Sequence, residues 1–135
     1  MEYVPPTAEQ IFALRTSAGI AGLVDDVETV EAVVAGIGAF AAGEWAPLRR
    51  AGDTVGARLE NGVVRLPDGF AEAYRGYVEA GWNTIAGPEE FGGQGLPFAL
   101  ACCVLENLGA ANLGFSLLPM LTVGAIEALH HHGSE

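Results

Sequence analysis

A glycine-rich loop between two helical patterns is the stretch that most constrains this chain. The run GWNTIAGPEEFGGQGLP occupies residues 81–97. Pro88 fixes its own φ, and Gly92 and Gly93 can take backbone angles that are closed to other residues. Pro97 is well placed as the first residue of a helix. The run therefore predicts an ordered, glycine-shaped connection between two helices, which we call the 81–97 loop.

The strongest periodic signal lies before this loop and predicts a long amphipathic helix over residues 27–48. Asp25 or Asp26 can cap its start, and Pro47 is expected to end or kink it. The apolar residues recur at steps of three and four: Val27, Val30, Val34, Ile37, Ala41, Trp45 and Leu48. A shorter helix is expected to begin near Thr7, which has the spacing of a capping box with Gln10.

Further elements complete the secondary-structure prediction. Residues 49–55 read as a loop. Asn61-Gly62 favours a type I′ turn in a small hairpin over residues 57–66, which should lie against the helices because a lone hairpin is marginal. Helices are expected from Phe70 to about residue 81 and from Phe98 to about Gly109. A short segment over residues 112–118 should precede a last helix over residues 119–131.

These elements predict an all-α fold with five or six helices and a minor β-hairpin. At 135 residues the chain suits one domain with a real core. A net charge of −11 argues against nucleic acid and against an anionic membrane surface. Residues 107–126 carry no charge and could span a bilayer by length, but glycine and polar residues interrupt them. We therefore expect buried helices there and no membrane span.

The cysteine pattern and the N-terminal sequence bear on localisation. Cys102 and Cys103 are adjacent in the sequence, so they cannot staple distant parts of a fold. The start of the chain lacks the basic region and the apolar run of a signal peptide. A reducing, cytoplasmic setting is the simple expectation.

The 81–97 loop, with its run PEEFGGQGLP, resembles the N-terminal helical domain of the acyl-CoA dehydrogenases. Runs that resemble the same family are RAGD, NGVVRLPDGF and YRGYVEAGW before the loop and ENLG after it. Residues 1–24 resemble an N-terminal extension with a short helix. This extension is typical of a longer branch that includes methylmercaptopropionyl-CoA dehydrogenases. Residues 25–135 would then form the helical domain, truncated before the β-domain and the C-terminal domain.

The resemblance implies a part in the α,β-dehydrogenation of an acyl-CoA thioester with FAD as cofactor. In the family the catalytic glutamate and most of the flavin site belong to the two later domains. The segment alone should therefore neither catalyse nor bind FAD. Its partners would be acyl-CoA, the missing domains, further copies in a homo-oligomer and an electron acceptor. By analogy, the closed end of the acyl pocket would be lined by Phe115, Leu117, Leu118, Met120 and Leu121.

Other residue patterns have a plain reading beside a functional one. Glu89 and Glu90 could serve acid–base chemistry, but adjacent carboxylates beside a loop more often cap a turn. The glycines at residues 92–95 could cradle phosphate, yet they lack the full fingerprint. Three consecutive histidines at residues 130–132 point about 100° apart on a helix, so a favourable helix C-terminus is preferred over a metal site. Phe115 and its neighbours could equally be ordinary core.

Two functional hypotheses follow. The first is the N-terminal domain of an FAD-dependent acyl-CoA dehydrogenase, which forms part of the wall of the acyl pocket. The alternative is a stand-alone helical interaction module or small subunit that binds a partner chain or a hydrophobic ligand. The ending Gly133-Ser134-Glu135 reads as the cap of another helix and favours the first.

Overall fold

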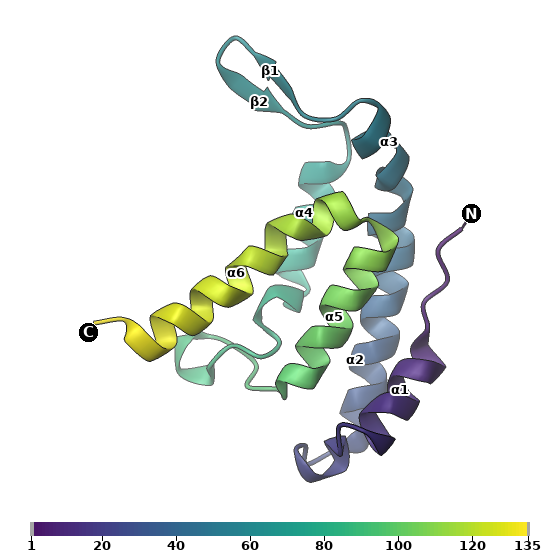
Figure 1. Ribbon diagram of the computed structural model, residues 1–135, viewed down its shortest axis with the longest axis vertical. Coiled ribbons are helices and arrows are strands. Elements are labelled where there is room, and N and C mark those ends of the chain that lie inside the picture. The colour runs from purple at the N-terminus through teal and green to yellow at the C-terminus, as the bar shows by residue number, and fades with distance from the viewer. Residues whose placement is uncertain (1, 135) are drawn as a thin grey trace.

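Helices dominate the fold, as the sequence predicts. The computed structural model describes residues 2–134, so Met1 and Glu135 lie outside it. Helices α2 and α5 pack against each other, α1 covers α2 from outside, and α6 packs on α5 (Figure 1). The α-helices are α1 (Thr7–Thr16), α2 (Val27–Phe40), α3 (Arg49–Thr54), α4 (Phe70–Glu79), α5 (Phe98–Ala111) and α6 (Leu113–His132). The strands are β1 (Arg58–Glu60) and β2 (Val63–Arg65).

The core lies where the apolar stripe of α2 meets α5. Val30, Val34 and Ile37 are almost fully buried, as the three- and four-residue spacing predicts. A π-helical turn (Ala41–Trp45) follows α2 directly and continues the stripe. It carries the indole of Trp45 into the core with no exposed surface. Burial of this apolar face against α5 is the main stabilising term of the fold.

The chain remains helical beyond Pro47, which corrects the prediction of a loop over residues 49–55. A 3₁₀ turn (Ala46–Leu48) follows the π-helical turn and leads into α3. Pro47 lies at the start of that turn, where its missing N–H group breaks no hydrogen bond. Thr54 Oγ1 donates a 2.8 Å hydrogen bond to Arg50 O within α3. The change from a π-helical to a 3₁₀ turn therefore accommodates Pro47 without ending the helical segment.

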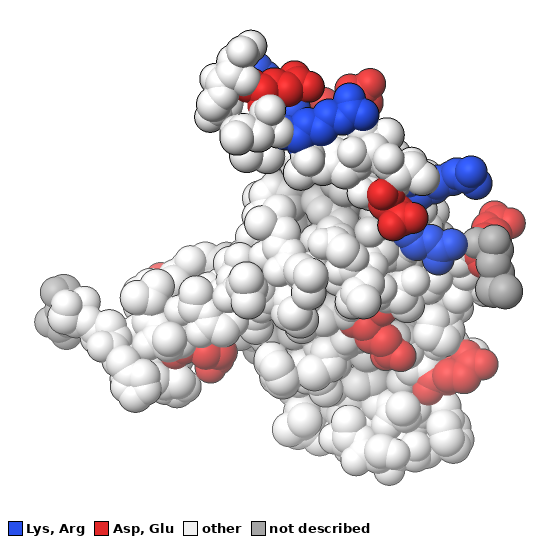
Figure 2. All heavy atoms as spheres, turned by 45° about the horizontal axis from the view of Figure 1, so that its top comes forward, with Lys and Arg blue, Asp and Glu red and all other residues white. Residues whose placement is uncertain are grey.

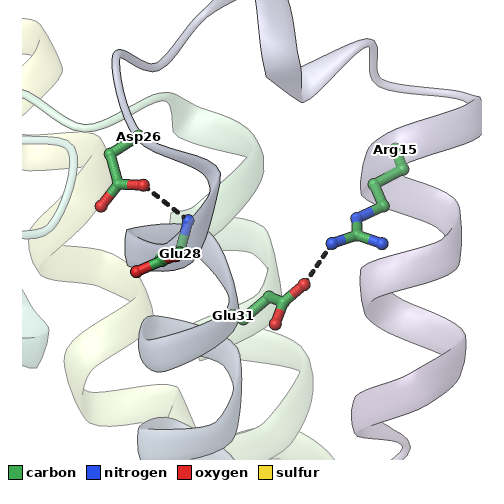
Figure 3. Close-up of polar contacts among 4 residues, drawn as sticks. All are labelled: Arg15, Asp26, Glu28 and Glu31. Carbon is green, nitrogen blue, oxygen red and sulfur yellow. Dashed lines mark hydrogen bonds and ion pairs between the residues drawn. The ribbon is translucent and has the colours of Figure 1, made fainter.

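The predicted cap of α2 is confirmed and that of α1 is wrong. Asp26 Oδ1 accepts a 2.9 Å hydrogen bond from Glu28 N, and this bond lowers the pKa of the Asp26 carboxyl (Figure 3). Thr7 is the first residue of α1 rather than its cap. The capping box fails because Gln10 turns toward α5 instead of back to the helix start. Figure 3 also shows the ion pair between Arg15 and Glu31 that joins α1 to α2.

The β-hairpin is confirmed, but its predicted contact with the helices is wrong. Asn61 and Gly62 have φ values of 52° and 79°, as a type I′ turn requires. Leu59 pairs with Val64 across the two strands. Every strand residue is exposed, and the hairpin projects away from the helices (Figure 1).

The last two helices differ from their predicted bounds. Helix α5 passes Gly109 and ends at Ala111, and α6 begins at Leu113 rather than at Pro119. The side chain of Asn112 accepts a 3.3 Å hydrogen bond from Phe115 N and thereby caps α6. Pro119 lies inside α6 with its ring fully buried, so packing offsets the lost hydrogen bond.

Most of α6 is exposed, although the sequence predicted buried helices over residues 107–126. The helix projects to one side of the molecule (Figure 1), and only 17% of its most apolar window is buried. Within residues 2–134 it is the helix that is long and apolar enough to cross a bilayer by length and composition. Figure 2 shows that this projecting arm carries few charged side chains, whereas arginines gather near the hairpin and α3.

Candidate functional site

The 81–97 loop is closed by its own backbone. Hydrogen bonds of 2.9–3.0 Å run from the amides of residues 92–96 to carbonyls of the same loop. The acceptors are the carbonyl oxygens of Glu89, Pro88, Thr84, Gly87 and Ile85, respectively. Because all five amides already have acceptors, none is free to hold an anion. The structure therefore contradicts the alternative in which this loop cradles phosphate.

Close backbone contact explains why the loop needs glycine. A Cβ atom on Gly93 would lie 2.0 Å from Gly87 O, far inside the contact distance of the two atoms. Gln94 Nε2 donates a 2.7 Å hydrogen bond to Gly81 O and closes the loop on its own beginning. The Glu89 side chain lies beside Gly95, where a Cβ would meet it at 2.9 Å. These contacts give the loop, including Glu89, a structural role.

A large groove opens at the other end of the molecule, beside the start of α6. Its volume is about 1030 Å³, and α3, the base of the hairpin, the start of α4 and the start of α6 form its walls. We call it the α3–α6 groove. Its apolar lining includes Leu66, Phe70, Phe115 and Leu118, and its polar lining includes Arg49, Arg50, Asp53 and Asn112. An apolar floor with a few polar groups is the usual make-up of a small-molecule site.

The sequence left open whether Phe115 is a core residue or lines a pocket. The structure places it in the core and also in the lining of the groove. Its ring stacks on Trp45 with centroids 3.8 Å apart and planes 12° apart. The ring of Phe70 lies 4.6 Å away on a tilted plane. Asn112 Nδ2 donates a 3.3 Å hydrogen bond to Trp45 O, and this bond ties the start of α6 to the π-helical turn. The floor of the groove is therefore held rigidly by buried aromatic rings.

The structure brings only some of the five predicted pocket residues together. Leu118 joins Phe115 in the lining of the groove. Leu117, Met120 and Leu121, also on α6, are exposed by 49%, 44% and 73% and are outside that lining. No contact with a ligand tests any of the five, so the acyl-pocket role stays a prediction.

The remaining groove residues were not predicted from the sequence. Arg49, Arg50 and Asp53 were assigned to a loop, and Leu66 and Phe70 to separate elements. Asn112 offered a usable signal, because asparagine before an apolar run is a common helix cap. The other residues gave none, since they meet only when α3 and α6 fold together.

Burial changes the pKa of two groups away from the groove, Tyr77 and Cys103. Burial raises the pKa of Tyr77 to about 12, and burial with the nearby Glu106 carboxylate raises the pKa of Cys103 to about 11. Cys102 is exposed and Cys103 is buried. His131 Nε2 lies 3.4 Å from Glu127 Oε2 at the end of α6. Residues 2–134 contain no group of three side chains placed to bind a metal ion.

Comparison with known proteins now identifies the class. Residues 28–135 match the family model described as "Acyl-CoA dehydrogenase, N-terminal domain". Together with the helical fold and the closed 81–97 loop, this match shows that the chain belongs to the acyl-CoA dehydrogenase family, a family of oxidoreductases. The match covers the helical domain and supports the first of the two hypotheses drawn from the sequence.

Two relatives show which members of the family the chain is similar to. The chain is 40% identical over 126 residues to the 3-methylmercaptopropionyl-CoA dehydrogenase of Ruegeria pomeroyi, which covers 93% of this chain and 21% of that protein. It is 36% identical over 72 residues to the probable acyl-CoA dehydrogenase fadE25 of Mycobacterium leprae, which covers 53% of this chain and 18% of that protein. The chain thus spans about a fifth of the length of these relatives.

Proposed function

We propose that this chain serves as the N-terminal domain of an FAD-dependent acyl-CoA dehydrogenase and forms part of the wall of its acyl pocket. The observation that carries the proposal is the α3–α6 groove in a domain that matches this family. Its floor, formed by Phe70, Phe115 and Leu118, would contact the apolar acyl chain. Because Trp45 backs Phe115 rigidly, bulk on the floor would favour a short or medium chain.

The 81–97 loop would not hold the pyrophosphate of FAD. The amides of the 81–97 loop are engaged within the loop, so they offer no cradle for a pyrophosphate. In the assembled enzyme FAD would supply the hydride acceptor, held mainly by the two later domains. What this chain contributes is a wall that orients the acyl chain and excludes water from it.

The exposed side of α6 would be covered by the rest of the enzyme. Large apolar side chains exposed on one helix are typical of an interface, and five on α6 are exposed by half or nearly so: Leu113, Leu117, Leu118, Leu121 and Leu129. A bilayer is the competing occupant for such a helix. We favour a protein partner because the last turns of α6 carry Glu127 and three histidines after the uncharged run. We further propose a cytoplasmic homo-oligomer that passes electrons to a separate acceptor.

Reduction of the flavin by substrate tests the proposed activity. The full-length protein should lose its flavin absorbance on addition of a short or medium acyl-CoA. Leu118→Trp would narrow the groove and should lower kcat/KM several-fold, most for the longest acyl chain accepted. Leu23→Trp, an exposed change after α1, is the matched control. A full-length protein whose flavin no acyl-CoA reduces would contradict the proposal.

Dye binding tests the proposed interface. The isolated 135-residue chain should bind an apolar dye and self-associate through α6. Leu117→Glu together with Leu121→Glu should reduce both effects, since each places a charge on the exposed face. A monomeric parent chain that binds no dye would count against a docking face. Binding to neutral lipid vesicles that these changes abolish would point to a bilayer instead.

A further inference from the structure

Residues outside the matched family region carry the longest-range polar contacts in the molecule. The family match begins at residue 28, yet Tyr3 and Gln10 both reach α5. Tyr3 OH donates a 2.7 Å hydrogen bond to Asn107 Oδ1. Asn107 Nδ2 donates 2.9 Å and 2.8 Å bonds to Gln10 Oε1 and Cys103 O. Gln10 Nε2 donates a 2.8 Å bond to Glu106 Oε2.

The centre of this network is buried, and the hydrogen bonds around its central residue are complete. Asn107 has no exposed surface, and Gln10 is 5% exposed. The oxygen and both donor positions of the Asn107 amide are satisfied by the bonds to Tyr3, Gln10 and Cys103. A buried amide is costly when it loses a partner, so the network favours one register of the N-terminal segment on α5.

Close packing of the N-terminal segment on α2 favours the same register of this segment. Where the N-terminal segment crosses α2, a Cβ on Gly38 would lie 2.8 Å from Pro5 Cβ and 3.4 Å from Thr7 Oγ1. Glycine therefore lets the segment approach the helix closely. Leu14 and Ile20 add apolar anchors that are 4% and 0% exposed within the core.

The position of Asn107 connects this segment to the groove. It lies one turn before the end of α5, and Asn112 N donates a 2.8 Å hydrogen bond to Leu108 O at that end. Asn112 then caps α6 and lines the α3–α6 groove. We propose that residues 3–24 act as a latch, which holds the corner between α5 and α6 in place through the Asn107 network. This inference concerns the conformation of the domain and does not depend on the proposed catalytic function.

Amide hydrogen exchange of the full-length protein tests the latch. Tyr3→Phe removes only the hydroxyl that bonds Asn107. We expect exchange over residues 103–116 to become about tenfold faster, the factor that corresponds to one lost hydrogen bond. Tyr74→Phe is the matched control, because the Tyr74 hydroxyl makes no hydrogen bond within residues 2–134. The hairpin, residues 58–65, is an internal reference whose exchange should not change.

A second variant separates the latch from a general loss of stability. Asn107→Asp keeps the acceptor for Tyr3 but replaces the donor that bonds Gln10 and Cys103. It should accelerate exchange over residues 103–116 more than Tyr3→Phe does, while residues 58–65 again stay unchanged. Exchange over residues 103–116 that is the same in Tyr3→Phe as in Tyr74→Phe would overturn the proposal. So would acceleration spread evenly over the whole chain.

Discussion

The packed pair α2 and α5 and the projecting helix α6 have similar apolar sequences but opposite surroundings. Val34 and Leu100 of the pair have no exposed surface, whereas Leu121 of α6 is 73% exposed. Because the two regions are similarly rich in apolar residues, hydrophobicity alone does not tell core from interface. The difference lies in which neighbours are present: α2 and α5 cover each other, and most of α6 extends past them.

The largest expected contrast is between a buried aromatic side chain and an exposed apolar one. Trp45→Ala removes a fully buried ring that stacks on Phe115, so it should lower the free energy of unfolding by about 3–5 kcal/mol. Leu129→Ala, which lies on α6 and is 70% exposed, should change it by less than about 0.5 kcal/mol. Urea unfolding of both variants measures the difference. Equal losses would mean that α6 is packed in solution.

A smaller contrast separates a crowded glycine from an open one. Gly93→Ala forces a Cβ against Gly87 O in the 81–97 loop and should cost about 2–3 kcal/mol. Gly43→Ala, in the π-helical turn, meets nothing within 4 Å and should be neutral or slightly stabilising. Thermal unfolding of the two variants is the measurement. A neutral Gly93→Ala would show that the loop does not close on its own backbone.

The smallest contrast lies between two adjacent side chains of α5. At pH 8 a thiol reagent should modify the exposed Cys102 quickly and the buried Cys103 only on unfolding. The pKa of Cys103 is raised from 9.0 to about 11 in the folded state, so that state keeps its proton longer than the unfolded chain. Its contribution to stability is therefore complete below pH 9 and is lost as the pH rises from 9 to about 11.

Cys103→Ala isolates this pH effect. The variant should show a shallower loss of stability than the parent between pH 9 and pH 11, while Cys102→Ala should follow the parent. Urea unfolding at several pH values measures the slope. Identical slopes for the two variants would contradict the burial of Cys103.

Local sequence rules were sufficient where a few neighbouring residues decide the structure. The Asn61-Gly62 turn forms because both residues tolerate a positive φ. The apolar spacing of α2 and the cap at Asp26 follow from helix geometry in the same way. The family was predicted from the resemblance of PEEFGGQGLP together with the other runs in their order. The glycines of this run are needed for backbone contacts within the loop itself.

Tertiary contacts decided what those rules could not. The direction of Gln10 and the early start of α6 each depend on contacts with residues distant in sequence. The α3–α6 groove is likewise invisible in the sequence, since Arg49 and Leu118 become neighbours only in the folded chain. The sequence by itself determined the helical type through local spacing, and it indicated the family through the resemblance of its motifs. Only packing decided which apolar face forms the core, which lines the groove and which stays exposed. The reason is that burial depends on neighbours that the local pattern does not specify.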